Sequence, residues 1–452
     1  MRKIMALVLA AMMLLACCSA LAEAPEGYPE VKEGIDFEGK DVYIYDYWSA
    51  TDWKDNTAEK TEEEQAQYDY RTWLEDTYNV KLHQIQRGDW GTCAEEMTNF
   101  NTTPEDDKLA IFIIEPGKVG SLVANGVAHA IDYDLSADKW NQADISLWSK
   151  GGKVYGLYTG KSEPRQCLYF NKRVLEEAGI DWTTIYDMQA DGTWTWDVFE
   201  DMVKKITRDT DNDGVNDIYG LIGSGDDMYV CAVFTNGGAF FDVDADGKLY
   251  PAMDSDACKS ALAWGKDLWT NYCAPTPEGA NWDWFKEAWK QGYTGFYMYQ
   301  TYGGFNDNSE MADMEDEWGC VAFPVPEKGG NYITVNSDNI TLIPSCYDDE
   351  TVAKLAFIYD MWTNNTPGYD DEDAWIGNKY NFTDERAVDE TYAMLREPEH
   401  VVVNRVVVLG TQNDVLGNSL LWALGGSTPA ELIEAGMPEW QSLCDKYNTS
   451  GN

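Results

Sequence analysis

The chain has 452 residues, of which 79 are acidic and 33 are lysine or arginine, giving a formal net charge of −46 at neutral pH. Such a charge excludes nucleic acid and anionic membrane surfaces as partners, because both are bound through cationic contacts to phosphate. The length exceeds what one simple hydrophobic core supports, so it predicts two lobes or domains.

Residues 1–22 have the pattern of a secretory signal peptide. A basic start precedes an apolar run over residues 4–16, which is shorter than the roughly 20 residues that span a bilayer. Cys17 closes a sequence that resembles a bacterial lipobox, and Ala22 closes one that fits ordinary signal peptidase. We therefore expect an exported protein, either lipid-anchored at Cys17 on the cell surface or free in the extracellular or periplasmic space.

The mature chain begins with an acidic segment, residues 23–36, which contains two prolines and is predicted to be a flexible spacer. Residue types then predict strands over 42–45, 80–85 and 109–114, with a helix through 70–77. This order implies an open parallel α/β sheet. Ligands bind such sheets at the carboxyl ends of the strands, where Asp46, Trp48 and Glu115 follow two of them.

The rest of the chain continues the alternation of strands and helices. We expect strands at 154–158 and 167–170, and helices at 172–178, 195–206, 256–269, 351–362 and 430–443. Gly179 is a suitable residue to end the first of these helices, and Thr428-Pro429 is a suitable start for the last.

Several segments together resemble the family 1 extracellular solute-binding proteins of carbohydrate ABC importers. The signature is Tyr169-Phe170-Asn171-Lys172 with Leu175, followed by Ala178-Gly179-Ile180 and Thr195-Trp196-Asp197. Further matches occur in the family's order: 209–214 with Tyr219-Gly220, Asn236-Gly237-Gly238 with Asp242, 292–298, 323–326, and 428–431 leading to Trp440-Gln441. One departure is the approach to the third strand, where Pro104 to Lys108 replaces the Gly-x-x-Pro-Asp that the family often shows.

The resemblance implies a two-lobed, type 2 periplasmic-binding-protein-like fold, with open sheets flanked by helices and a ligand cleft between the lobes. It assigns residues 37–165 and about 318–365 to the first lobe, and residues 166–317 and about 366–452 to the second. The implied function is capture of a sugar or oligosaccharide by lobe closure and delivery to an ABC membrane permease. The resemblance implies a monomer that is not an enzyme and requires no cofactor.

Aromatic and polar residues in predicted loops are candidates for contacting the sugar. Aromatic rings stack on the C–H faces of sugars, and a few polar groups orient the hydroxyls. The aromatic candidates are Trp48, Trp282, Trp284, Tyr299, Tyr302 and Trp375. The polar candidates are Asp46, Glu115, Arg165, Asn236 and Gln300. Each of them also fits an ordinary packing, capping or solvated role.

An acidic loop resembles an EF-hand calcium loop. Asp209, Asp211, Asp213 and Asp217 occupy positions 1, 3, 5 and 9, and Gly214 stands at position 6, where the turn is sharp. Position 12 is Gly220 and not the usual bidentate glutamate. Both a structural Ca²⁺ and a solvated turn fit. The shorter run 242–247 looks similar and also fits a turn between strands.

Catalytic patterns are scarce, since the chain has three histidines and no HExxH, GxSxG, Walker A or GxGxxG motif. The cysteines outside the signal region lack CxxC spacing, which argues against a zinc cluster and leaves both disulfides and free thiols open. Two alternatives to a binding protein remain: a secreted glycoside-acting enzyme, and a calcium-dependent carbohydrate adhesion module.

Overall fold

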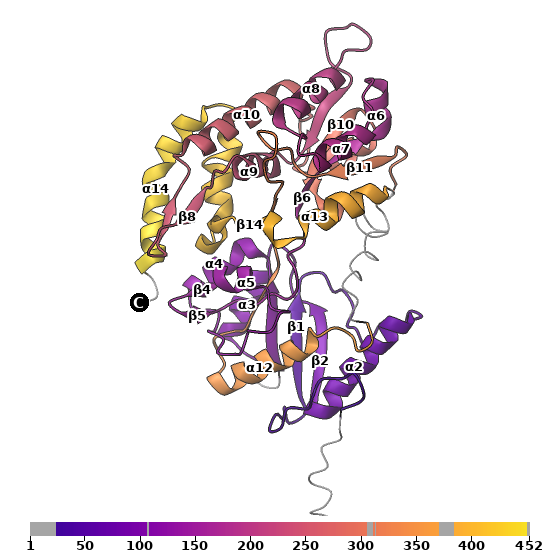
Figure 1. The fold of residues 1–452 in the computed structure, drawn as a ribbon. Coiled ribbons are helices and arrows are strands. Elements are labelled where there is room, and N and C mark those ends of the chain that lie inside the picture. The colour runs from indigo at the N-terminus through magenta and orange to yellow at the C-terminus, as the bar shows by residue number, and fades with distance from the viewer. Residues whose placement is uncertain (1–23, 106–107, 305–310, 312, 370–383, 450–452) are drawn as a thin grey trace, which may run out of the picture.

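Two α/β lobes, one above the other in Figure 1, make up the computed structural model, which describes residues 24–105, 108–304, 311, 313–369 and 384–449. The predicted lipidation site Cys17 and the aromatic candidate Trp375 lie outside the described residues. Within those ranges, none of the helices combines the length and apolar character needed to span a bilayer.

The first lobe is built on a four-stranded sheet in the order β13-β3-β1-β2. Its strands are β1 (Lys40–Asp46), β2 (Val80–Gln86), β3 (Lys108–Ile114) and β13 (Ile340–Leu342), and only β13 is antiparallel to its neighbour. Its helices are α2 (Glu62–Tyr78), α3 (Cys93–Thr102), α4 (Pro116–Ala124), α5 (Gln142–Leu147) and α12 (Asp349–Trp362). The three predicted strands and the first predicted helix are confirmed.

Local sequence accounts for these elements. The apolar run of β3 is largely buried, as expected for a strand covered on both faces. Thr61 and Glu64 form a capping box that starts α2, and Asn79 ends it in a left-handed conformation with φ of 49°.

The second lobe contains another four-stranded sheet, in the order β11-β6-β10-β7. Its strands are β6 (Gln166–Asn171), β7 (Tyr219–Gly223), β10 (Thr294–Gln300) and β11 (Trp318–Val321). Its α-helices are α6 (Lys172–Glu177), α7 (Thr183–Ala190), α8 (Trp196–Ile206), α9 (Gly225–Thr235), α10 (Asp256–Tyr272), α11 (Phe285–Lys290), α13 (Ala393–Leu395) and α14 (Pro429–Thr449). All six residues of β6 are buried, and the Trp196 and Trp264 rings stack at 4.1 Å to join α8 to α10.

Short elements complete the two lobes. They are the hairpins β4 (Ser149–Lys150) with β5 (Lys153–Val154) and β8 (Phe241–Val243) with β9 (Leu249–Pro251), and the parallel pair β12 (Thr334–Val335) with β14 (Val401–Val402). The short helical turns are η1 (Thr301–Gly304), η3 (Ala387–Tyr392), η4 (Pro398–His400), η5 (Arg405–Leu409), η6 (Asn413–Asn418) and η7 (Leu421–Ala423). The eight cysteines among the described residues form no disulfide.

The chain crosses between the two lobes three times. Two of the crossings lie wholly within the described residues, at 157–165 and 322–339, and we call these the crossing segments; the third follows α12. The strand predicted over 154–158 is wrong, since only Lys153–Val154 is a strand and Leu157 makes an isolated bridge to Thr341. Leu157 is buried and Val154, Tyr155 and Tyr158 are half-buried, because the segment packs along the edge of the first sheet before it leaves the lobe. The expected boundary near 318 also differs from the structure, because β11 pairs with β6 in the second sheet.

An apolar contact joins the lobes beside the crossing segments. Helix α4 of the first lobe packs on η5, whose Val406, Val407 and Val408 are buried. Gly120 permits this approach, since a Cβ there would lie 2.6 Å from the carbonyl oxygen of Val407 and closer still to that of Val408.

We expect Gly120→Ala to destabilise the protein by about 1–3 kcal/mol, because an added methyl group must push α4 away from η5. Chemical denaturation measures the change in unfolding free energy. Gly425→Ala is the matched control, since its Cβ would meet nothing within 4 Å. Equal stability of both variants would contradict this close packing.

Candidate functional site

The parallel strands of both sheets end at the crossing segments. In the first lobe, Tyr47 follows β1 and donates a hydrogen bond to Asn339 of the second crossing segment at 2.6 Å. In the second lobe, Thr301 follows β10, and its N–H donates to the carbonyl of Arg165 at 2.9 Å. Loops from the two lobes therefore face one another where an open α/β sheet binds its ligand.

Arg165 lies at the centre of this interlobe region. Its guanidinium is 5.3 Å from the centroid of the Tyr302 ring, and its buried Nε has no hydrogen-bond partner among the described residues. Its positive charge acts to lower the pKa of Glu115 in the first lobe and of Asp227 in the second. A buried donor without a partner is costly, so Arg165 is suited to bind a polar group of a ligand.

Two carboxyl groups flank Arg165 from opposite lobes. Burial raises the pKa of Glu115, although its carboxylate caps α4 by accepting from the N–H of Gly117 at 3.0 Å. Burial also raises the pKa of Asp227, and hydrogen bonds from Ser224, Gln166 and Gln300 oppose that shift. Both groups hold their protons more tightly than an exposed acid does.

Exposed aromatic rings gather at the same strand ends. Among the described residues, the large apolar side chains left exposed are Trp48, Trp90, Val215, Tyr250, Trp282, Tyr302 and Trp422. Trp48 and Trp90 follow β1 and β2, and Tyr302 follows β10. Trp282 contacts this last strand end through Phe285 and Tyr299. The interlobe region thus has exposed aromatic rings on both lobes.

Trp422 is held in place by a half-buried acid. Its indole N–H donates to both carboxylate oxygens of Asp226, at 2.9 and 2.7 Å, while half of the side chain stays exposed. Asp226 lies in the first turn of α9, directly after β7, and burial raises its pKa to about 6. This pair orients an aromatic face toward solvent, as a stacking platform for a ligand requires.

Two of the predicted polar contacts have structural roles instead. The Asp46 carboxylate is almost fully buried and accepts hydrogen bonds from Trp48, Ser49 and Gln84, which fix the loop after β1. Asn236 ends α9 and donates to the carbonyl of Ala257 at 2.8 Å, which ties α9 to α10. We therefore remove both residues from the candidate ligand contacts.

The other aromatic candidates divide by exposure. Trp282 is 67% exposed and Tyr302 is 41% exposed, so both present rings to solvent. Tyr299 is buried, and its hydroxyl lies 2.5 Å from that of Tyr302, so it supports that ring from below. Trp284 is half-buried and packs on the core. Gln300 lies at the end of β10, where it bonds to Asp227.

Sequence reasoning missed Trp90, Asp226, Asp227 and Trp422. The rule that selected Trp48 also applies to Trp90, because each tryptophan follows a strand of the same parallel sheet. Asp226 and Asp227 likewise follow β7. Trp422 has no such signal, since it reaches Asp226 across 196 positions of the sequence.

The acidic loop brings three of the four predicted calcium ligands close together. Carboxylate oxygens of Asp209, Asp211 and Asp217 lie within 4.8 Å of one another. Asp213 is not in this group, and its carboxylate accepts from the N–H of Val215 at 2.8 Å. Asp217 is held by Thr210, whose N–H and hydroxyl both donate to it and lower its pKa.

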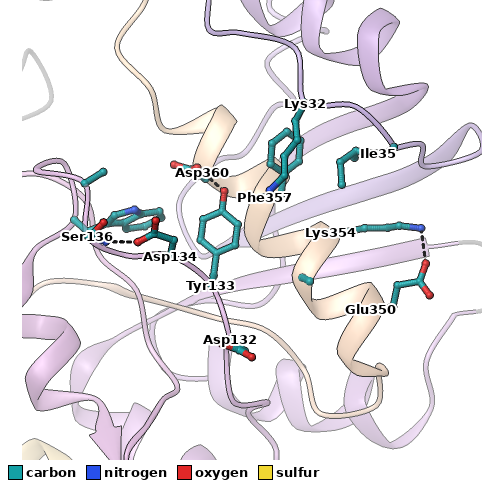
Figure 2. Close-up of a pocket in the computed structure, with 14 residues that line it drawn as sticks. Lys32, Ile35, Asp132, Tyr133, Asp134, Ser136, Glu350, Lys354, Phe357 and Asp360 are labelled. Carbon is teal, nitrogen blue, oxygen red and sulfur yellow. Dashed lines mark hydrogen bonds and ion pairs between the residues drawn. The ribbon is translucent and has the colours of Figure 1, made fainter.

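A groove of about 720 Å³ lies on the first lobe, away from the strand ends (Figure 2). The Tyr133 hydroxyl donates to Asp360 at 2.7 Å, and Lys354 pairs with Glu350 at 3.1 Å. Phe357 at its floor is 4% exposed. Because these polar groups already have partners and little apolar surface is open, the groove is a weaker candidate than the interlobe region.

Comparison with protein families decides the identity. A family model described as bacterial extracellular solute-binding protein matches residues 41–359, which span both sheets. The chain belongs to this family. No protein of curated function matches the solute-binding protein in sequence.

Solved structures confirm the expected two-lobed, type 2 periplasmic-binding-protein-like fold. An ABC substrate-binding protein of Listeria monocytogenes in complex with cycloalternan aligns with TM-score 0.60 and 16% identity, over 89% of this chain and 98% of its own. A cyclic α-maltosyl-1,6-maltose binding protein of Arthrobacter globiformis gives 0.59 and 17%, over 89% and 98%. UgpB of Mycobacterium tuberculosis in complex with glycerophosphocholine gives 0.60 and 13%, over 89% and 99%.

We expect the indole N–H signal of Trp422 to titrate with a midpoint near pH 6, because protonation of Asp226 weakens the hydrogen bond that it accepts. Nuclear magnetic resonance of the protein labelled with ¹⁵N at its tryptophan indoles measures this, and Trp422→Phe assigns the signal. The Trp194 indole, which donates to the backbone carbonyl of Ala322, is the internal control and should not move. If the Trp422 signal stays unchanged from about one pH unit below the midpoint to about one above it, Asp226 does not titrate there and the prediction is wrong.

Proposed function

We propose that this solute-binding protein captures a sugar or oligosaccharide between its lobes and delivers it to the membrane permease of an ABC importer. The observation that carries the proposal is the set of exposed aromatic rings on both lobes, beside Arg165 and the half-buried carboxyl groups of Glu115 and Asp227. Stacking surfaces with a few placed polar groups are what binding of a sugar ring needs.

Family and structural relatives support this choice. One of the similar structures is in complex with cycloalternan, and another is a cyclic α-maltosyl-1,6-maltose binding protein. A third binds glycerophosphocholine on the same fold, so the fold does not by itself choose the ligand. The side chains at the strand ends therefore determine which ligand is bound. Closure would follow from tighter binding of ligand to the closed state.

The proposal makes the protein a carrier and not a glycoside-acting enzyme. A retaining or inverting glycosidase needs two free carboxyl groups across the scissile bond. Here Asp226 is bound to Trp422, and Glu115 caps α4. We further propose export through the N-terminal signal and, by way of Cys17, a lipid anchor at the cell surface.

A panel of mono- and oligosaccharides should raise the melting temperature of the mature protein for one glycan class. A ligand at 1,000 times its dissociation constant adds about 4 kcal/mol to the stability of the bound state. Chromatography after incubation should recover that glycan unchanged. Recovery as fragments would favour the enzyme, and absence of any shift would rule out carbohydrate as the ligand class.

Trp422→Ala should weaken affinity for that glycan by about tenfold or more, because an aromatic stacking surface is lost. Isothermal titration calorimetry measures the change. Tyr250→Ala is the matched control, since this exposed ring lies on β9, away from the strand ends. Equal affinity of both variants would place the ligand elsewhere.

We also propose that the acidic loop binds a structural Ca²⁺. Three carboxylates within 4.8 Å of one another support this, and the missing position-12 glutamate predicts weak binding. No other cofactor is proposed. The alternative of a calcium-dependent adhesion module would use the same loop, and it would require glycan binding that depends on Ca²⁺.

Ca²⁺ should raise the melting temperature, and Asp209→Asn should abolish the rise. At 100 times the dissociation constant the gain is about 2.7 kcal/mol. Asp246→Asn, in the second acidic turn at 242–247, is the control and should keep the response. A rise unaffected by Asp209→Asn would place the ion outside this loop, whereas loss of glycan binding on chelation would favour the adhesion module.

A further inference from the structure

A cluster of buried polar groups lies where the two crossing segments meet α5. Asp144 on α5 has no exposed surface, and Asp338 on the second crossing segment is 5% exposed. The Nδ2 of Asn336 donates to Asp144 at 3.2 Å and to Asp338 at 3.0 Å. Two buried carboxyl groups therefore share one donor in the hinge of the molecule.

The first crossing segment enters the same cluster. The N–H of Glu163 donates to Asp338 at 3.3 Å, and the Ser162 hydroxyl lies 3.1 Å from the Nδ2 of Asn336. Asn141, which caps α5, also donates to Ser162 at 3.1 Å. Both crossing segments are thus connected to one helix of the first lobe through the carboxyl pair.

Two adjacent buried carboxylates cannot both be ionised without strong repulsion. Burial and the charge of Asp338 raise the pKa of Asp144 to about 8, which leaves it protonated at neutral pH and donating to Asp338. Burial raises the pKa of Asp338 as well, against hydrogen bonds from Ser162, Glu163, Asp144 and Tyr158.

Neither acid of the pair forms an ion pair with a described residue. Among the described residues, the groups that act on Asp144 are Asp338 and Asn336. Tyr158 donates to Asp338, and burial raises its pKa far above neutrality, so it remains a phenol. The carboxylate of Glu163 turns away toward Arg396 and Tyr392. A proton between the two acids is therefore what holds the cluster together.

We propose that Asp144 and Asp338 share a single proton across the hinge, and that this proton positions both crossing segments for ligand capture. Asp144 and Asp338 are positioning residues, because they act on the ligand only through the relative placement of the lobes. The second half of the proposal rests on the proposed capture of ligand between the lobes, and the first half does not.

The sign of the pH effect follows from proton linkage. The folded protein binds this proton more tightly than the unfolded chain does, so its contribution to stability is complete at acidic pH. The contribution falls as pH rises from the ordinary carboxyl value near 3.8 to about 8. Asp144→Asn keeps a donor toward Asp338 and an acceptor for Asn336, but it cannot lose a proton.

The test is the unfolding free energy of wild type and Asp144→Asn, measured by denaturant titration between about pH 4 and pH 8. We expect the stability of the variant relative to wild type to increase steadily with pH. Asp338→Asn, which also leaves a single titrating acid, should show the same trend and serves if Asp144→Asn does not fold. Asp191→Asn, at an exposed helix end, is the control and should give a flat difference.

Ligand affinity tests the positioning role. At pH values above the pKa of the shared proton, the dissociation constant of the wild type should rise by up to about tenfold per pH unit. This is the limit for one linked proton. It should stay constant in Asp144→Asn. A flat stability difference would overturn the shared proton. A rising difference with affinity that does not depend on pH would overturn the positioning role. If no ligand is found, the stability series still decides whether the proton is there.

Discussion

Buried polar side chains accept hydrogen bonds from backbone N–H groups where the chain crosses between the two sheets. The hydroxyl of Thr334, which has no exposed surface, accepts from the N–H of Arg165 at 2.7 Å and of Gln166 at 3.3 Å. Gln166 in turn accepts from the N–H of Val335 at 2.8 Å. A buried N–H without a partner costs about 1–3 kcal/mol, so these bonds fix how the crossing segments run beside each other. That register determines which loops of the two lobes face one another.

The gathering of functional side chains follows from this register. Because β10 pairs with β6, Gln300 lies opposite Gln166. Tyr302, two residues after Gln300, therefore lies beside Arg165, which precedes Gln166. Tryptophan side chains contribute large apolar surfaces to a protein core, and here Trp194, Trp289 and Trp440 are fully buried. The tryptophans that stay exposed, such as Trp48 and Trp422, lie at strand ends or are held by an acid from one. The exposed tryptophan rings gathered there mark the candidate ligand site.

The sequence predicted the fold well where local patterns determine structure. Strand β3 follows from its apolar run, and the helix α6 ends before Gly179, whose φ of 68° favours glycine. The strand predicted over 154–158 is wrong because, after Val154 in β5, the segment pairs with the first sheet only through the isolated bridge from Leu157 to Thr341. Periodicity reports burial, and it does not report which neighbour supplies the burial.

The candidate site was less predictable because its decisive contacts join distant parts of the chain. Position after a strand selected both Trp48 and Asp46, yet only the tryptophan stays open to solvent. The Asp46 carboxylate is saturated by its own loop, including the neighbouring strand residue Gln84. Asn236 matched a family segment, but its amide bonds to α10. Hydrogen-bond partners of this kind become visible only once the tertiary structure is known.

The acidic composition has two separate physical consequences. Most carboxylates are solvated and give the molecule its net charge of −46. A few near the lobe junction are buried, as Asp144 is, or half-buried, as Glu115 and Asp227 are, and desolvation raises the pKa of all three. Such groups are tolerated because each is hydrogen-bonded, and they then serve as directed polar partners. In the interlobe region these groups offer directed hydrogen bonds to a neutral, hydroxyl-rich ligand.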